Sequence, residues 1–251
     1  MSEPPRDPMR AAQANMRPPA PRRFYKRADF VAADGGGFAL RLDGRGARTP
    51  SKRPLVAPTR AVAELIAAEW AAQGETIEPL SMPATRLANS AIDGVAGALA
   101  ATRAEIVNYA AADLVCYRAA APQALVALQA AAYDPVLAWA RDRLGAHFTA
   151  TVGVAHVAQP EAALAAARAA VEVYTDPFAV AALHVMTSLV GSLLLALMTA
   201  ESALSPEAAW RAAHVDEDFQ IGRWGEDDEA KRRRAARWRD FAAAAKVLTA
   251  T

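Results

Sequence analysis

Residues 178–200 constrain the fold more than any other segment, because all 23 positions lack a formally charged side chain. About 20 apolar residues can cross a bilayer, and a helix that is apolar nearly all round must be buried in protein or in lipid. Since no aromatic belt accompanies the segment, we predict a central core helix, with a membrane-associated segment as the alternative. Polar and small side chains recur along one side of this helix and would let neighbouring helices approach closely: His184, Thr187, Ser188, Gly191 and Ser192.

The chain from residue 59 onward is predicted to be mostly helical, because apolar residues recur there with helical spacing. Gly74 stands where a C-terminal cap belongs, and Asp176 and Ser205 each offer a capping oxygen before a proline. Residues 148–157 are the exception and read as a short strand or an extended loop. The predicted helices cover roughly residues 59–73, 87–110, 123–143, 160–175, 177–200, 205–220 and 227–248.

Residues 24–56 show the pattern of strands instead. Residues 38–42 alternate apolar and polar side chains, and the glycines that follow Asp34 and Asp43 supply tight turns. The sequence therefore predicts an α+β protein. A small antiparallel sheet forms an N-terminal α/β domain, and a larger helical bundle follows it.

The predicted organisation has three parts. Residues 1–21 are rich in Pro and Arg and are predicted to be a disordered tail. Residues 22–97 form the sheet-plus-helix domain, and residues 98–251 form the helical domain. Four residues are expected to pack these two domains together: Arg45, Trp70, Asn89 and Asp93.

The composition gives no global reason to expect nucleic acid or a membrane surface as partner, because the net charge is +1 and 53% of the residues are hydrophobic. Cys116, in an apolar run, is expected to be a buried, inert thiol, and one Cys with four His cannot form a Cys/His zinc set. No GxSxG, HExxH, CxxC or Walker sequence is present, so no catalytic residue, cofactor or metal site is predicted.

A basic run at residues 231–234 is the first of two charged features. Nucleic-acid recognition is a weak explanation, because the chain is near neutral and no known binding module surrounds the run. An amphipathic helix whose Arg stems lie along the edge of the core explains it better.

The second charged feature is the segment DEDFQIGRWGEDD at residues 216–228. On a helix, Glu217, Gln220 and Trp224 share one face, and the Trp-Gly pair indicates a helix end. Physical chemistry alone favours a solvated acidic helix with a packed Trp224.

This segment resembles the C-terminal signature of the ATP synthase assembly chaperones that bind the alpha subunit of F1. The resemblance covers about residues 23–230, and the Pro/Arg-rich arm departs from the family pattern. Other blocks resemble the family in the same order: residues 23–26, 42–45, 48–50, 68–73, 82–83 with 85, 87–89, 91–93, 113–118, 129 with 133–135, and 191–192.

The resemblance implies a chaperone rather than an enzyme. Such a protein would bind free alpha subunit transiently and shield its beta-facing surface until the beta subunit displaces it. The partner-binding residues are predicted to be Asp216, Glu217, Gln220, Trp224, Glu226 and Asp227. The chaperone is expected to be monomeric alone and to reside in the bacterial cytoplasm, or in the mitochondrial matrix for eukaryotic relatives.

A metal-dependent helical hydrolase is the alternative. It would use His214, Asp216 and Glu217 around a divalent ion, although the spacing does not match a calcium loop.

Overall fold

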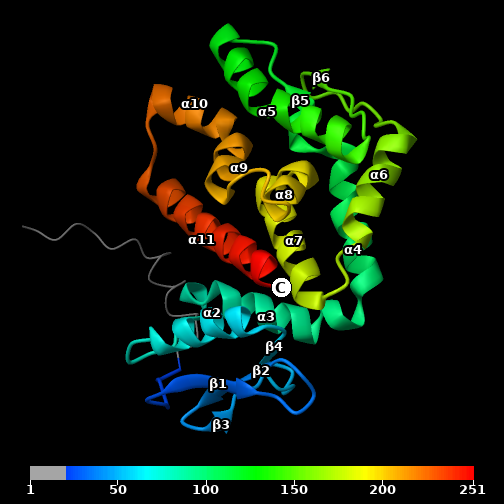
Figure 1. The fold of residues 1–251 in the computed structure, drawn as a ribbon. Coiled ribbons are helices and arrows are strands. Elements are labelled where there is room, and N and C mark those ends of the chain that lie inside the picture. Colours follow the sequence, from blue (N-terminus) through cyan, green and yellow to red (C-terminus); the bar gives the residue numbers. More distant parts are fainter. Residues whose placement is uncertain (1–20) are drawn as a thin grey trace, which may run out of the picture.

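The structure, a computed structural model, describes residues 21–251 (Figure 1). Its N-terminal part is a four-stranded sheet in which β2 is central: β1 and β2 form an antiparallel hairpin, and β3 and β4 also pair with β2. Gly36 and Gly37 take positive φ in the turn between β1 and β2, as the strand prediction requires. The strands are β1 Ala28–Ala32, β2 Phe38–Leu42, β3 Arg45–Gly46, β4 Val56–Ala57, β5 Tyr117–Arg118 and β6 Thr151–Val152.

Helices make up most of the remaining chain, and α2 and α3 lie between the sheet and the other helices (Figure 1). The predicted α+β class, with a small antiparallel sheet followed by helices, is confirmed. The helices are α2 Arg60–Ala71, α3 Pro83–Asp93, α4 Leu99–Asn108, α5 Gln123–Leu144, α6 Glu161–Glu172, α7 Pro177–Val190, α8 Leu193–Ala200, α9 Pro206–Ala213, α10 Val215–Trp224 and α11 Asp228–Ala250, with short 3-10 helices at Pro79–Ser81, Val95–Gly97, Tyr109–Ala112 and Leu114–Cys116.

Helix α7 is the centre of the helical part. It packs against α3, α4, α8 and α11, and its apolar residues from Phe178 to Leu183 are all buried. Asp176 caps its first turn by accepting hydrogen bonds from the N–H groups of Phe178 and Ala179 at 2.8 and 3.1 Å. The prediction of a buried core helix that begins at Pro177 is confirmed. Among the described residues, no helix has the length and apolar content needed to cross a membrane.

The prediction that this helix continues to residue 200 is wrong, because the helix is interrupted at Gly191 and Ser192. Gly191 takes φ 66°, a left-handed conformation that ends α7. Ser192 then starts α8 by accepting the Leu195 N–H at 3.1 Å. The apolar run therefore folds into two helices, each with its own caps.

Two other predicted helices are also divided. The helix expected over residues 87–110 is split into α3 and α4 at Gly94, and the helix expected over 205–220 is split into α9 and α10 at His214. Helix α2 ends at Ala71 with Ala72 as its cap, so Gly74 lies beyond the cap. Residues 151–152 are the short strand β6, which pairs with β5 in parallel.

The buried carboxylate of Asp113 stabilises the break between α7 and α8. Asp113 has no exposed surface, and its oxygens accept hydrogen bonds from Val115 N–H at 3.2 Å and from Leu194 N–H at 3.1 Å. The N–H of Leu114 donates to Gly191 O at 3.0 Å. Burial raises the pKa of Asp113 to about 6, although these hydrogen bonds and one from Ser192 oppose the shift.

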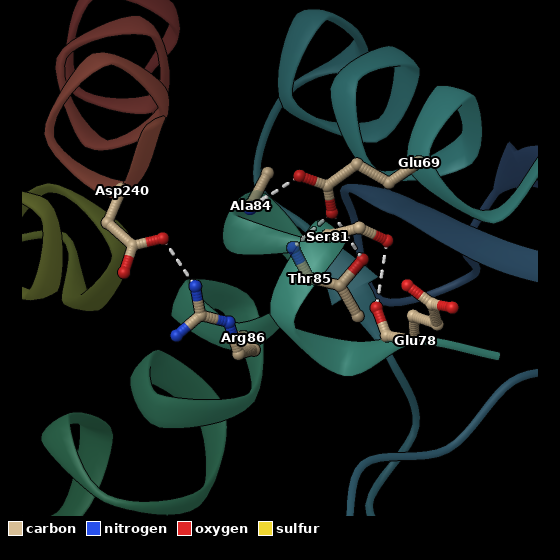
Figure 2. Close-up of polar contacts among 7 residues, drawn as sticks. All are labelled: Glu69, Glu78, Ser81, Ala84, Thr85, Arg86 and Asp240. Carbon is tan, nitrogen blue, oxygen red and sulfur yellow. Dashed lines mark hydrogen bonds and ion pairs between the residues drawn. The ribbon is translucent and has the colours of Figure 1, made fainter. Parts of the chain in front are cut away.

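A second carboxylate joins the two helices that cover the sheet (Figure 2). Glu69 of α2 accepts hydrogen bonds from Ala84 N–H at 2.7 Å and from both Thr85 N–H and Thr85 Oγ1 at the start of α3. Burial raises the pKa of Glu69, and the bonds from α3 oppose this. Arg86, one residue further, forms an ion pair with Asp240 of α11. The N-terminal helices are thus tied to the C-terminal helix by polar contacts.

The predicted division at residue 97 stays a prediction. One cluster of buried side chains includes residues from both sides of it, such as Leu40, Ile66 and Leu183. Asp93, expected to join the domains, instead accepts hydrogen bonds from Thr49 Oγ1 and Ser51 N–H, both within residues 22–97. Apart from Pro21, the predicted tail lies outside the described residues.

Asp113 gives the stability of the fold a specific pH dependence. Its pKa is about 6 in the folded protein and 3.8 without the fold, so the folded state binds this proton more tightly. The stabilising contribution of Asp113 is therefore fully present below pH 3.8 and is lost as the pH rises through 6. Asp113→Asn does not titrate, so the stability of the wild type relative to this variant should fall by about 2 kcal/mol between pH 4 and pH 7. Urea unfolding at several pH values measures the difference, and a difference independent of pH would contradict the prediction.

Two glycine substitutions should have opposite effects on stability. Gly191→Ala puts a Cβ on a residue with φ 66° and should lower the free energy of unfolding by about 1 kcal/mol. Gly222→Ala lies inside α10, where an added Cβ meets nothing within 4 Å, and should raise it by about 0.5–1 kcal/mol. Thermal and urea unfolding of both variants test the assignment of the helix break.

Candidate interaction surface

The segment from α9 to the start of α11 contains all the predicted partner-binding residues. Helix α10 lies on the side of the helical part away from the sheet, whereas α11 runs back toward α2 and α3 (Figure 1). Ser205 caps α9 by accepting the Ala208 N–H at 3.2 Å, so the predicted start at Ser205-Pro206 is confirmed. Asp216, Glu217 and Asp218 occupy the first turn of α10, where negative charge is favoured by the helix dipole. Gly225 ends α10 with φ 81°, which confirms the predicted end at the Trp-Gly pair.

Aromatic side chains in contact with one another support this segment. The Trp210 ring lies 4.0 Å from the His214 ring and 5.6 Å from both Trp238 and Phe241, measured between centroids. His214 is buried, and its Nδ1 is 2.7 Å from the carbonyl oxygen of Trp210, which fixes Nδ1 as the protonated nitrogen. Burial lowers the pKa of His214. On α11, Phe241 belongs to the buried core and Trp238 packs against it, as the predicted amphipathic helix requires.

Asp216 faces inward and joins α10 to α5. Its Oδ1 accepts a hydrogen bond from Gln129 Nε2 at 2.7 Å. Gln129 is itself buried, and its Oε1 accepts the Ala119 N–H at 2.7 Å. Nearby, burial and the charge of Asp216 raise the pKa of Tyr133 to about 12. Asp216 therefore acts as an anchor for α10.

Asp218 provides the second anchor. It forms an ion pair of 2.5 Å with Arg234 of α11, whose side chain is four-fifths covered. The Glu217 side chain is as exposed as that of Asp218, and its carboxylate lies 3.8 Å from His214 Nε2. The first turn of α10 is thus held to α5 on one side and to α11 on the other, while Glu217 faces solvent.

The last turn of α10 is the exposed part of the segment. Trp224 is 76% exposed, so the prediction that it packs is wrong. No residue of α10 is buried, so the Trp224 indole has no buried apolar side chain on its own helix to pack against. Gln220, Glu226 and Asp227 are exposed as well, and Arg223 lies over the Phe219 ring at 4.5 Å.

Asp227 is exposed but also has a structural role. Its Oδ1 accepts hydrogen bonds from Glu229 N–H at 2.8 Å and Ala230 N–H at 2.9 Å, which makes it the N-cap of α11. These hydrogen bonds hold its pKa below the usual value.

Two hollows flank α9. A groove of about 480 Å³ has Trp210 and Trp238 among its lining residues, with Glu226 and Arg234 beside them. A second groove, of about 400 Å³, is largely apolar and runs between α5, α8 and α9 up to Val215, the residue before Asp216. Its lining includes Leu128, Pro135, Met198 and Leu204.

The acidic residues near His214 do not converge on one point. Asp216 is hydrogen-bonded to Gln129, Asp218 is paired with Arg234, and Glu217 approaches His214. Within residues 21–251, no three His, Cys, Asp or Glu side chains are grouped so that they could hold a metal ion. Cys116 is buried and unpaired, as predicted, and burial raises its pKa to about 12.

Sequence reasoning missed the residues that hold α10 in place. Gln129 and Tyr133 belong to a block that resembles the chaperone family, yet nothing in the sequence connects them to Asp216, 87 positions away from Gln129. Arg234 stands in the basic run, but its pairing with Asp218 follows only from the path of the chain between α10 and α11.

Known proteins resemble this chain over nearly its whole length. A family model described as "ATP12 chaperone protein" matches residues 22–141. The crystal structure of a putative chaperone from Agrobacterium tumefaciens is 48% identical, with a TM-score of 0.89 over 99% of this chain and 92% of that one. The crystal structure of Atp12 from Paracoccus denitrificans is 40% identical, with a TM-score of 0.83 over 91% of this chain and 98% of that one. An aspartate-to-lysine mutant of the latter protein gives a TM-score of 0.82 at the same identity.

Anchoring and exposed residues of α10 should differ in their effect on stability. Asp216→Ala leaves the buried Gln129 amide without its acceptor and should cost about 1–3 kcal/mol. Trp224→Ala removes an exposed side chain and should change the free energy of unfolding by less than about 0.5 kcal/mol. Urea unfolding compares them, and hydrogen exchange should be faster in α10 of the first variant only. Equal losses of stability would contradict the assignment.

Proposed function

Because this chain belongs to the ATP12 chaperone family, we propose that it binds the free alpha subunit of F1 during ATP synthase assembly and shields the surface that later contacts beta. The chain is a chaperone and not an enzyme. The hydrolase alternative based on His214, Asp216 and Glu217 is therefore wrong.

A subunit that has not met its partner exposes the surface it will later bury. Such a surface promotes aggregation. A chaperone that covers it keeps the subunit soluble, and it must also dissociate when beta arrives. The interface should therefore protect alpha without the slow dissociation of a permanent complex. We propose that the chaperone is monomeric before it binds alpha and acts in the bacterial cytoplasm, with the mitochondrial matrix as the location of eukaryotic relatives.

The observation that carries the proposed site is the exposed indole of Trp224 at the tip of an acidic helix. Aromatic residues are enriched at protein interfaces because they combine a large apolar area with few rotatable bonds. The first turn of α10 is anchored at Asp216 and Asp218, so the exposed side chains are presented on a supported helix. This arrangement supports direct contact with the partner by Glu217, Gln220 and Trp224.

The other predicted binding residues take different parts in this proposal. Asp216 orients α10 from within, and Asp227 fixes the start of α11. Glu226 lies at the groove that contains Trp210 and Trp238, where it can add to the acidic surface. The apolar groove that reaches Val215 provides area beside Glu217 that an apolar segment of alpha could cover.

Charge reversal and indole removal test this surface. Glu217→Lys and Trp224→Ala should each weaken binding to purified F1 alpha subunit by about tenfold or more, because one reverses a charge at the contact and the other removes an aromatic anchor. Calorimetry or surface plasmon resonance with isolated alpha measures the affinity, and suppression of alpha aggregation measures the chaperone activity.

Glu172→Lys is the matched control, since Glu172 is also an exposed acid but lies at the end of α6. It should bind alpha like the wild type. If Glu217→Lys folds normally and still protects alpha fully, the assignment of this surface is wrong.

A further inference from the structure

A pocket on the sheet, distant in sequence and space from α10, is lined by residues from three separate parts of the chain. It measures about 530 Å³, which is within the usual range for a ligand site. Phe24 and Tyr25 come from the segment before β1, and Trp70 comes from the last turn of α2. Asp43 lies in the turn between β2 and β3, and Arg45 begins β3. Each of these segments belongs to a block that resembles the chaperone family in sequence. All three lie far from α10 (Figure 1).

The floor of this sheet pocket is apolar and firmly supported. Tyr25 and Leu42 are buried in a small core of their own with Ile77 and Met82. The Tyr25 and Trp70 rings lie 5.5 Å apart, and Tyr25 Oη donates to the carbonyl oxygen of Trp70 at 2.7 Å. The floor is therefore preformed.

The edge of the sheet pocket exposes an aromatic ring. Phe24 is 72% exposed, although its ring lies edge-on to Tyr25 at 5.3 Å. In addition, the Trp70 Nε1–H is buried and has no hydrogen-bond acceptor among the described residues. Such a donor is costly to leave unpaired.

The charge around the sheet pocket is positive. Arg45 and Arg48 line it, and Asp43 is the one carboxylate among its lining residues. Both oxygens of Asp43 already accept hydrogen bonds, from the N–H groups of Lys26 and Arg27, which hold its pKa below the usual value. Arg23 adds a further cation, 4.7 Å above the Tyr25 ring. A cationic edge around an aromatic floor complements an apolar side chain flanked by carboxylates.

We propose that this sheet pocket is a second client-binding site, which takes an acidic segment of the alpha subunit that carries an apolar or aromatic side chain. The inference rests on the proposed function, because it assumes alpha as the client. The chain's own N-terminal arm is a poorer occupant, since residues 1–21 carry three Arg against Glu3 and Asp7 and would bring a net positive charge to a positive edge. With α10 at the opposite end (Figure 1), the chaperone holds its client at two separated places.

Photo-crosslinking tests the sheet pocket in the full chain. The photoreactive amino acid p-benzoylphenylalanine replaces Phe24, Trp224 or Val173, and each variant is irradiated with isolated F1 alpha subunit. Val173 is also 72% exposed and serves as the control position. Positions 24 and 224 should both crosslink to alpha and position 173 should not. Mass spectrometry should place the attachment from position 24 in an Asp/Glu-rich segment of alpha.

Other crosslinking outcomes separate the two proposals. Crosslinking from position 224 alone overturns the sheet-pocket site and leaves the proposed function standing. Attachment from position 24 to the chaperone's own residues 1–21 also overturns it, in favour of the arm as occupant. Absence of crosslinks from both positions overturns the two proposals together.

Charge reversal gives a second measurement. Arg45→Glu should weaken binding of alpha about tenfold at low salt, with a smaller effect at high salt. Arg41→Glu makes the same change on β2 at an exposed position that does not line the sheet pocket, and it should bind within about twofold of the wild type. Equal affinity of the two folded variants overturns the proposal.

Discussion

The burial of most of α7 is the constraint on which the rest of the structure depends. An apolar helix with almost no polar face cannot lie at a surface, so other helices must enclose it. Helices α3, α4, α8 and α11 do so, and they come from both halves of the chain. The C-terminal helix therefore reaches back to the N-terminal part, where Thr59 Oγ1 donates to the carbonyl oxygen of Ala250 at 2.6 Å.

Carboxylates fix the starts of several of the helices that surround α7, and of α7 itself. Asp113 holds the start of α8, Glu69 holds the start of α3, and Asp176 and Asp227 hold the starts of α7 and α11. Each accepts N–H groups that have no partner within the helix. Alanine-rich helices pack in many geometries, so fixed ends supply much of the specificity that the small side chains cannot.

Carboxylates at the start of the helix also explain how α10 presents its exposed side chains. Asp216 and Asp218 hold its first turn to α5 and α11, whereas its last turn ends at an exposed Trp224. A surface of this kind combines a supported base with an apolar tip. It suits a chaperone, whose contact with a client must form readily and must later be released.

The sequence by itself determined the α+β class, the hairpin at Asp34, the helix starts at Asp176 and Ser205, and the burial of Cys116 and of the apolar run. These features follow from local periodicity, caps and composition, which act over a few residues. The tertiary structure alone decided the break at Gly191, because that break is stabilised by Asp113, 78 positions earlier in the chain. It also decided that Asp216 faces inward to Gln129 and that Trp224 faces solvent. Helical spacing shows which residues share a face, but the direction of that face depends on packing partners that lie far away in the sequence.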